Sequence, residues 1–423
     1  MAASPPAPQP PIDRLEMLYE LSQAFNSTLD LDEILNRVID EVIVALRAER
    51  GFVMLYDEGG ELVFRVARGM DQSVIKDPVF QVSYSTVTAV ARDGQPVLTG
   101  DAQIDPRFSM RQSVKLLGLR SILCVPLKSK DRILGTVYVD NRIQAGIFTQ
   151  ADLELLSAIA SSAAVALENA RLYLLAVEKG RLEQELAMAF QLQASLLPAE
   201  TPQVPGWEFA ARWLPARQVA GDYYDFIPGQ GDQWGVVVAD VSDKGMPAAL
   251  FMALTRSIVR ASMDHTLFPM EGMRRANRLI CADSTSGMFV TLFYAMLDPE
   301  KSQLTYINAG HNPALLYKAG GSARLIPLGR TGMALGVWVD SEYEQHTLLF
   351  NPGDCLVFYT DGVTDSMDSQ GNPFGMDALE QIVLRHGGDS AQEMATILEQ
   401  AIASHAGPTE RFDDITIVVL KRI

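Results

Sequence analysis

Four positions in the second half of the chain place an aspartate at the end of an apolar segment. Asp240 follows the apolar run 236–239, Asp361 ends CLVFYTD, Asp222 lies in VAGDYYDF, and Asp413 and Asp414 precede ITIVVL. An ionised carboxylate is costly to bury unless a partner neutralises it. If the last strand runs antiparallel to the strands that end at Asp240 and Asp361, these acids lie together at one end of a sheet.

Converging aspartates repel one another unless cations lie between them, so this pattern favours a metal site. Divalent ions such as Mg²⁺ and Mn²⁺ prefer hard oxygen ligands of this kind. No Cys or His belongs to these positions, which argues against zinc. Divalent ions held in this way act as Lewis acids and can activate a bound water. The alternative, in which each Asp only caps a turn, explains one position more easily than four in one domain.

The composition limits the other possibilities. A chain of 423 residues with 48% hydrophobic and 21% charged residues is expected to fold into two or three domains. The net charge of -17 argues against nucleic-acid binding, which needs clustered Lys and Arg. No run of about 18 apolar residues predicts a membrane span. Cys124, Cys281 and Cys355 lack metal-site spacing and indicate a reducing, cytosolic setting.

The order of sequence patterns predicts separate units. Residues 1–11 are rich in Pro and Ala and are expected to be disordered. Two helical patterns follow, the second beginning at the N-cap Asp30, and short strands then extend to Asn141. From Phe148 to Leu197 the helical period is nearly continuous, which is typical of a coiled coil, although Gly180 interrupts it. The prolines of PAETPQVPGW end this helix.

The last unit is predicted to contain strong strands and one clear helix. The predicted strands are WGVVVAD, FVTLFYAML, QLTYIN, CLVFYTD and ITIVVL. The segment DPEKS between the second and third strands is expected to form a hairpin loop. The helix begins at Pro247, because proline is favoured at the first helical position.

Seven stretches carry a resemblance to a known family: QLQASLLP, VAGDYYDF, VADVSDKGMPAALFM, MFVTLFYAMLD, YINAGHNPALL, FYTDGVTD and RFDDITIVVL. In this order, from about residue 196 to 423, they resemble the SpoIIE-type branch of metal-dependent (PPM, type 2C-like) serine/threonine protein phosphatases. The resemblance implies an α-β-β-α sandwich with two Mn²⁺ or Mg²⁺ ions at one end of its sheets. It also implies a phosphorylated, STAS-type anti-sigma-factor antagonist as the substrate. Ala220 stands where the family often has a second glycine.

The resemblance also assigns roles to individual residues. Asp240 would bridge both ions, and the carbonyl of Val241 would bind one of them. Asp361 and Asp413 would complete the other ion's ligands, and Asp222 would bind a metal or a metal-bound water. Asp413 fits the family position better than Asp414, but the adjacent acids leave that choice open.

Two further residues are candidates for phosphate chemistry. Arg217 lies five residues before Asp222 and resembles the phosphate-binding arginine of the wider superfamily, since arginine can hold phosphate with two parallel hydrogen bonds. An ordinary solvated arginine is the equal alternative. His311, in NAGHNPALL, is a possible general acid, but a turn-stabilising role is favoured.

Residues 12–172 resemble a GAF domain, with paired helices, a six-stranded sheet and a closing helix. Asn141, Arg142, Phe148 and Asp152 only partly match the signature of cyclic-nucleotide-binding GAF domains, and a plain helix start also explains them. All five histidines lie in the last unit, so the GAF-like domain cannot bind haem iron through a histidine of its own.

The sequence therefore predicts an α+β, multidomain protein. The expected parts are a disordered tail at 1–11, a GAF α/β sandwich at 12–172, a helical coiled-coil linker at 173–200 and a PPM α-β-β-α sandwich at 201–423. Five apolar linker residues are expected to pair with a second subunit, with the phosphatase body as the alternative partner: Leu182, Leu186, Phe190, Leu196 and Leu197.

The predicted function is that of a cytoplasmic, homodimeric, signal-regulated protein serine/threonine phosphatase. A small ligand or a protein would act at the GAF domain, and neither a nucleic acid nor a membrane is expected as a partner. The alternatives are a two-metal nucleotide cyclase and a catalytically silent dimeric GAF-sensing scaffold. The diguanylate cyclase signature is missing, and intact acids at all four positions argue against a silent scaffold.

Overall fold

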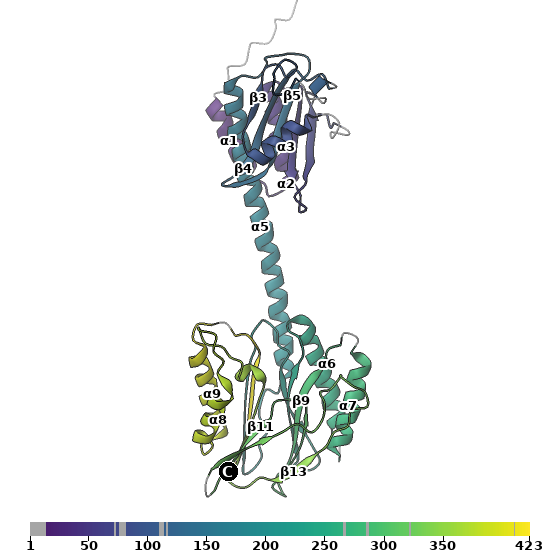
Figure 1. The fold of residues 1–423 in the computed structure, drawn as a ribbon, viewed down its shortest axis with the longest axis vertical. Coiled ribbons are helices and arrows are strands. Elements are labelled where there is room, and N and C mark those ends of the chain that lie inside the picture. The colour runs from purple at the N-terminus through teal and green to yellow at the C-terminus, as the bar shows by residue number, and fades with distance from the viewer. Residues whose placement is uncertain are drawn as a thin grey trace, which may run out of the picture. The chain divides into compact units, whose positions relative to one another are not determined.

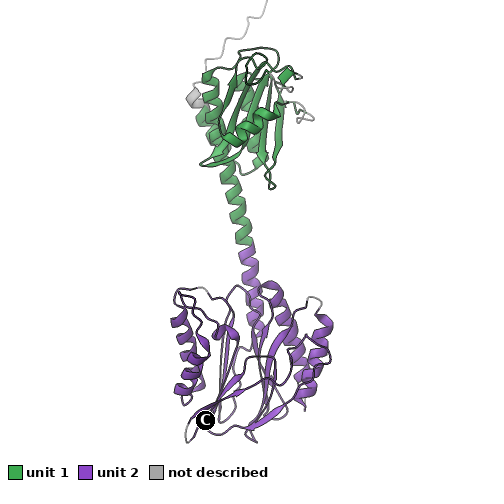
Figure 2. Ribbon diagram, viewed as in Figure 1, with its two compact units in different colours: residues 1–181 green, residues 182–423 purple. Residues whose placement is uncertain are grey.

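The computed structural model describes residues 14–71, 73–75, 82–109, 114–115, 117–264, 268–284, 287–320, 323–409 and 411–423. The predicted disordered tail at 1–11 lies outside this range. The chain forms two compact units, residues 1–181 and 182–423 (Figure 2). The division falls inside one long helix, α5, within the segment 173–200 that the sequence predicts as a linker.

The first unit is built on an antiparallel sheet with the strand order β2-β1-β5-β4-β3. Its strands are β1 Arg50–Tyr56, β2 Leu62–Gly69, β3 Val97–Thr99, β4 Ser121–Ser129 and β5 Arg132–Asn141, and its helices before α5 are α1 Arg14–Asn26, α2 Leu31–Leu46 and α3 Tyr84–Asp93. The four strands predicted from the sequence are confirmed. The described part of the sheet has five strands, where the family resemblance implies six.

The two faces of this sheet are covered by different helices. Val53 and Val137 face a core that includes α2 and the first part of α5, whereas Phe52 and Tyr138, one residue away on each strand, face α3. This alternation is the two-residue period of a strand with both faces buried. It explains why these strands read as short, strongly apolar runs.

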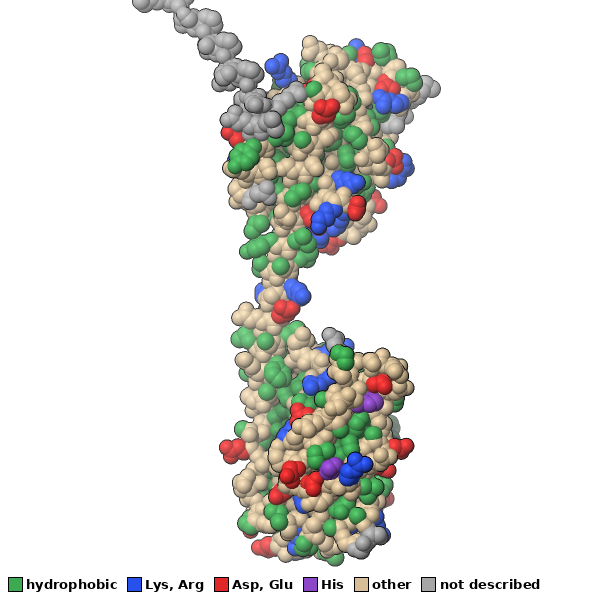
Figure 3. All heavy atoms as spheres, turned by 90° about the vertical axis from the view of Figure 1, so that its left-hand side faces the viewer, with side chains coloured by type: hydrophobic (Ala, Val, Ile, Leu, Met, Phe, Trp, Pro, Cys, Tyr) green, Lys and Arg blue, Asp and Glu red, His purple; other side chains and the backbone are tan. Residues whose placement is uncertain are grey.

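Helix α5 runs without interruption from Gln150 to Leu196 and continues through Gly180. It contains a window that is long and apolar enough to cross a membrane by length and composition alone. Its first part packs Leu156 and Ile159 into the core of the first unit, as a core helix of a globular domain does. Every side chain from Leu172 to Glu185 is exposed, and Figure 3 shows hydrophobic side chains along this stretch.

The second unit is a sandwich of two five-stranded sheets, with α6 and α7 on one outer face and α8 and α9 on the other (Figure 1). The first sheet has the order β13-β10-β9-β8-β7 and the second has the order β12-β11-β14-β15-β6. The strands are β6 Trp207–Leu214, β7 Tyr223–Pro228, β8 Trp234–Val241, β9 Val290–Asp298, β10 Gln303–Ala309, β11 Ala314–Lys318, β12 Arg324–Leu328, β13 His346–Leu349, β14 Cys355–Tyr359 and β15 Ile415–Arg422. The helices are α6 Met246–Met263, α7 Pro269–Asp283, α8 Gly375–His386 and α9 Ala391–Ala406, with a short 3₁₀ helix at Asp361–Val363.

This architecture confirms the predicted α-β-β-α sandwich and the five predicted strands. The hairpin between β9 and β10 and the helix with proline in its first turn are also present. Val236 and Val238 of β8 face the other sheet, while Val237 and Ala239 face the α6–α7 layer. Because β8 is buried on both faces, its sequence is a continuous apolar run.

Candidate metal centre

The aspartates predicted to form a site come from both sheets of the second unit, not from one. Asp240 lies near the end of β8 in the first sheet, and Asp222 directly precedes β7 of the same sheet. Asp361 follows β14, and Asp413 precedes β15, both in the second sheet, where β14 and β15 are antiparallel. The expectation of a single sheet was wrong, because an apolar strand pattern does not reveal which of two sheets a strand joins.

Asp222 links the two sheets. Its side chain is 2% exposed, and its Oδ2 accepts hydrogen bonds from Thr360 Oγ1 at 2.6 Å and Thr416 Oγ1 at 2.9 Å. Burial, followed by the charges of Asp240 and Asp414, raises the pKa of this carboxyl well above its ordinary value. The two threonines therefore fix the orientation of a carboxyl group whose ionised form is disfavoured by burial and by the neighbouring acids.

Asp240 lies at the centre of the acidic group. Burial and the charge of Asp361 raise the pKa of Asp240 to about 7, while a hydrogen bond with Asp222 lowers it. The pKa of Asp361 is also raised, by burial and then by Asp413. Raised carboxyl pKa values mean that these groups lack compensating positive charge, which a bound cation would supply.

The adjacent acids Asp413 and Asp414 have different partners. The Asp414 carboxylate accepts hydrogen bonds from the backbone N–H groups of Ala216 and Gly221, both at 2.8 Å. Asp413 instead pairs with the ammonium of Lys244 at 2.8 Å. Asp414 is thus engaged with the backbone, which favours Asp413 as the ligand, the residue preferred from the sequence.

Lys244 is held against the segment before β15 by three contacts. Besides its ion pair, it donates to the carbonyl of Phe412 at 2.9 Å and lies 4.1 Å from the centre of the Phe412 ring. Its charge also lowers the pKa of Asp361, although burial of that carboxyl has the larger, opposite effect. Lys244 is therefore a cation already present at the edge of the acidic group.

The carboxylates of this group fit a hard divalent ion, but in this structure some of them bind other side chains of the protein. Among the described residues, no three acidic, histidine or cysteine side chains are arranged as a complete metal site. Asp222 points to Thr360 and Thr416, and Asp413 points to Lys244. All candidate ligands are oxygen atoms, which Mg²⁺ and Mn²⁺ prefer. An ion that binds Asp413 would compete with Lys244 for its carboxylate.

The backbone near Asp222 approaches the end of β8 closely. A Cβ placed at Gly221 would lie 3.2 Å from the carbonyl oxygen of Val241, the backbone ligand implied by the family resemblance. Ala220, which replaces the family's glycine, is fully buried and accommodated. Its backbone N–H and C=O are both bound by the side chain of Gln193, at 2.9 and 2.6 Å.

Arg217 is exposed and lies in an open hollow next to this segment. The hollow has a volume of about 650 Å³ and is lined by Pro215, Ala216, Arg217, Gln218 and Arg411. Arg217 forms no ion pair with any described residue, so its guanidinium is available to a ligand. It remains a candidate for binding phosphate.

His311 has a structural role. Its backbone N–H donates to Asn308 at 2.8 Å, and its Nδ1 lies 2.9 Å from Thr291 Oγ1. Burial lowers the pKa of the imidazole to about 4, so at physiological pH the ring is neutral and lacks the second N–H proton of an imidazolium, the form that acts as a general acid. The turn-stabilising role favoured from the sequence agrees with these contacts.

Sequence reasoning missed the residues that contact the acids or the backbone beside them: Gln193, Lys244, Thr360 and Thr416. Thr360 and Thr416 lie within two residues of Asp361 and Asp414, so their hydroxyl groups next to strand-end acids were the available signal. No comparable local signal marks Gln193, since its partner is 27 residues away.

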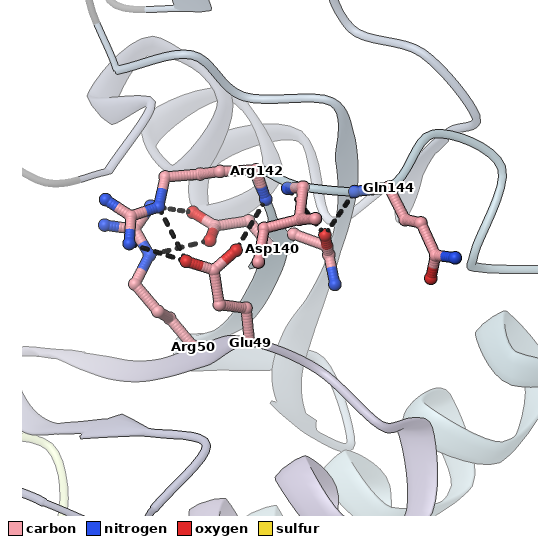
Figure 4. A network of polar contacts seen from close by, with 7 residues as sticks. Glu49, Arg50, Asp140, Arg142 and Gln144 are labelled. Atoms are coloured by element: carbon pink, nitrogen blue, oxygen red, sulfur yellow. Dashed lines mark hydrogen bonds and ion pairs between the residues drawn. The ribbon is translucent and has the colours of Figure 1, made fainter.

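In the first unit, the residues of the partial cyclic-nucleotide signature have structural partners (Figure 4). Arg142 pairs with Glu49, and Asn141 Oδ1 accepts the backbone N–H of Gln144 at 2.7 Å. Phe148 is buried in the core, and Asp152 accepts the Thr149 N–H and hydroxyl at the start of α5. These contacts support the plain helix-start explanation.

A second ion pair in the same network is buried. Arg50 binds Asp140 through two hydrogen bonds of 2.8 and 2.6 Å, on the face of the sheet that carries Phe52 and Tyr138 (Figure 4). Burial raises the pKa of Asp140, and the Arg50 charge opposes this rise without cancelling it. The pair therefore fixes the geometry at the end of the sheet, and removal of either partner would leave a buried charge unpaired.

Comparison with known proteins agrees with this two-unit organisation. Residues 230–423 match the family described as stage II sporulation protein E (SpoIIE), and residues 28–168 match the GAF domain. Protein IcfG of Synechocystis sp. is 31% identical over 273 residues, which cover 58% of this chain and 43% of IcfG. The phosphoserine phosphatase RsbU of Bacillus subtilis is 30% identical over 241 residues, covering 57% of this chain and 71% of RsbU.

Solved structures show the same fold. The PP2C domain of SiaA from Pseudomonas aeruginosa superposes with a TM-score of 0.52 at 22% identity, covering 59% of this chain and 99% of that domain. Three observations indicate the same family: the sandwich fold, the order of the acidic motifs and the extent of the match to RsbU. The chain belongs to the family of SpoIIE-type, metal-dependent serine/threonine protein phosphatases that includes RsbU, and it carries a GAF domain before its phosphatase domain.

Proposed function

We propose that this protein removes phosphate from phosphoserine or phosphothreonine of a STAS-type anti-sigma-factor antagonist, under the control of its GAF domain. The observation that carries the proposal is the convergence of Asp222, Asp240, Asp361 and Asp413 from two sheets. Membership of the RsbU family supports the reaction class, since RsbU is named a phosphoserine phosphatase.

Two Mn²⁺ or Mg²⁺ ions are the proposed cofactors. Asp240, Asp361, Asp413 and the Val241 carbonyl would hold them, and Asp222 would bind a metal or its water. Bound in this way, the ions supply an activated water and neutralise charge on the phosphoryl oxygens. This set is chosen over one with Asp414, because Asp414 holds two backbone N–H groups.

The chain's own residues orient the reacting groups. Thr360 and Thr416 bind one oxygen of Asp222, which fixes the carboxyl before a substrate arrives. Arg217 is placed to bind phosphoryl oxygens through two N–H groups and so to orient the phosphorus. His311 is neutral and buried, so protonation of the leaving serine oxygen falls to water or to a group at the rim of the site.

The first test is the release of phosphate from para-nitrophenyl phosphate by the full chain with Mn²⁺ and with EDTA. Release that requires Mn²⁺ supports the phosphatase. No release, together with cyclic product from a nucleoside triphosphate, would establish the cyclase alternative. No turnover of either substrate would favour the silent scaffold.

We also propose a homodimer formed through the exposed part of α5. Leu172, Leu175, Leu182 and Leu186 follow three- and four-residue steps, with Lys179 at the intervening position, as the apolar seam of a coiled coil does. Leu172, Leu175 and Leu182 are about half exposed in the single chain. An apolar stripe of this kind needs a partner helix for stability.

The structure changes which residues are available for this contact. Phe190 stacks on Trp213 with ring centres 5.6 Å apart, and Leu197 is buried in the second unit. The partner of these two residues is thus the phosphatase body, which was the alternative, because they lie where α5 meets that unit. The proposed dimer contact accordingly lies N-terminal to Phe190.

The same end of α5 offers a route for regulation. Trp213, on which Phe190 stacks, donates its indole N–H to the backbone carbonyl of Asp222 at 3.0 Å. Gln193 binds both backbone groups of Ala220, two residues before Asp222. We propose that a small ligand or protein at the GAF domain shifts α5, and that these contacts carry the shift to Asp222.

The proposed setting is the cytoplasm. Cys124 and Cys355 are buried and Cys281 is partly buried, and all three are free thiols. Burial raises the pKa of each, which keeps them unreactive. Free cysteines of this kind are typical of a reducing compartment.

A further inference from the structure

The segment Pro215–Gly221 forms an arch that is fixed near both ends. Asp414 accepts the N–H groups of Ala216 and Gly221, and Gln193 holds Ala220. Val219 and Ala220 are buried, whereas Arg217 and Gln218 are exposed at the middle of the arch. Arg217 is therefore presented to solvent from a short segment of constrained backbone.

A second arginine, close in sequence to Asp414, lies beside the arch. Arg411 lies three residues before Asp414, is exposed, and lines the same open hollow as Arg217. Within the part of the chain that the structure describes, neither guanidinium forms an ion pair. Lys244, by contrast, lies against the ring of Phe412 and is already paired with Asp413.

The charge and size of the hollow indicate the chemistry of its ligand. Two uncompensated guanidinium groups favour carboxylates or phosphates, which arginine binds through parallel hydrogen bonds. The volume of about 650 Å³ is in the range of sites that hold more than a single phosphoryl group. Asp413, the proposed metal ligand, is two residues from Arg411, so the hollow borders the proposed site of hydrolysis.

We propose that Arg217 and Arg411 form a two-guanidinium anion subsite in which Arg411 binds an acidic side chain next to the phosphorylated residue. This rests on the proposed phosphatase function and adds a substrate class to it: phosphoserine or phosphothreonine segments with flanking Asp or Glu. Because the hollow is open to water, Arg411 contributes selectivity and association rate more than tight affinity.

The experiment compares two phosphoserine peptides that are identical except for three flanking residues, Asp in one and the isosteric Asn in the other. The full chain with Mn²⁺ is expected to turn over the Asp peptide with about threefold to tenfold higher kcat/KM at low salt, as exposed charge pairs allow. Added NaCl reduces this preference by screening. Arg411→Ala brings the ratio of the two kcat/KM values close to one, and Arg411→Lys retains part of the preference.

Arg385→Ala is the matched control, since Arg385 is an exposed arginine of α8 in the same unit that forms no ion pair with a described residue. This variant is expected to keep the wild-type ratio. A wild-type chain without a preference for the Asp peptide overturns the subsite, and so does an Arg411→Ala variant that keeps the preference.

A binding measurement separates this inference from the proposed function. Fluorescence anisotropy of the same two peptides, labelled and titrated with the full chain, reports the preference without turnover. If neither peptide is hydrolysed but the Asp peptide binds more tightly through Arg411, the phosphatase proposal fails and the anion subsite stands. If phosphate is released from both peptides at equal rates, the phosphatase stands and the subsite fails.

Discussion

The raised pKa of Asp240 makes a prediction about stability without metal. The pKa of Asp240 in the folded chain, about 7, lies above the ordinary 3.8. The protonated carboxyl therefore contributes to the free energy of unfolding, and this contribution is fully present below pH 4. This contribution is lost as the pH rises through 7. Asp240→Asn removes the ionisation and is expected to stabilise the metal-free chain at pH 8, by at most about 4 kcal/mol for a shift of this size.

Thermal unfolding in EDTA at pH 5 and pH 8 measures this effect. The melting temperature of Asp240→Asn should exceed that of the wild type at pH 8, and the difference should shrink toward pH 5. A variant that melts below the wild type at pH 8 would show that ionised Asp240 does not strain the metal-free fold.

Loss of a proposed metal ligand should remove activity without unfolding the chain. Asp361→Ala or Asp240→Ala is expected to abolish nearly all Mn²⁺-dependent phosphate release, because nucleophile activation and charge neutralisation are lost together. Circular dichroism should remain that of the wild type. Asp377→Ala, an exposed acid of α8, is the control and should stay active. Full turnover by Asp361→Ala or Asp240→Ala would refute the ligand assignment.

The ion pair between Lys244 and Asp413 predicts competition with the metal. Lys244→Met keeps the apolar stem but removes the charge, so Mn²⁺ should bind several-fold more tightly, as a cation no longer occupies Asp413. Lys244→Arg should bind Mn²⁺ as the wild type does. Isothermal titration with MnCl₂ measures both variants. Weaker binding by Lys244→Met would mean that Lys244 instead prepares Asp413 for the ion.

At the scale of elements, the last turns of α5 and the segment before β7 form one connected structure. Gln193→Ala leaves both backbone groups of buried Ala220 without partners, which costs about 1–3 kcal/mol for each such group. We expect a lower kcat on para-nitrophenyl phosphate, because Asp222 follows two residues later. Gln191→Ala, an exposed neighbour on the same helix, is the control. Equal kcat values for the two variants would remove Gln193 from the proposed regulatory route.

At the scale of the whole molecule, the exposed leucines of α5 predict a dimer. Leu175→Glu with Leu182→Glu should convert it to a monomer, because charges within an apolar helix seam are strongly unfavourable. Sedimentation velocity at micromolar concentration measures the change. Glu183→Gln with Glu185→Gln alters exposed residues of the same stretch and is the control for helix surface charge. A monomeric wild-type chain would reject the dimer, and a dimeric Leu175→Glu, Leu182→Glu variant would move the contact elsewhere.

The sequence by itself determined the features that depend on local patterns. The run before Asp240 is apolar because β8 is buried on both faces, and it ends where the acid begins. The start of α6 at a proline and the hairpin at DPEKS could likewise be predicted from the sequence, since caps and turns are set by neighbouring residues. The acidic motifs, in their order, were enough to indicate a metal-dependent phosphatase.

Only the tertiary structure decided which partner each of these residues has. Whether Asp240 and Asp361 share a sheet depends on pairing between distant strands, which a strand's own pattern does not encode. The different partners of Asp413 and Asp414 depend on Lys244 and on the arch about 195 residues away. Phe190 fits a coiled-coil stripe by spacing, yet it stacks on Trp213, because burial is decided by what packs against a helix and not by the helix's period.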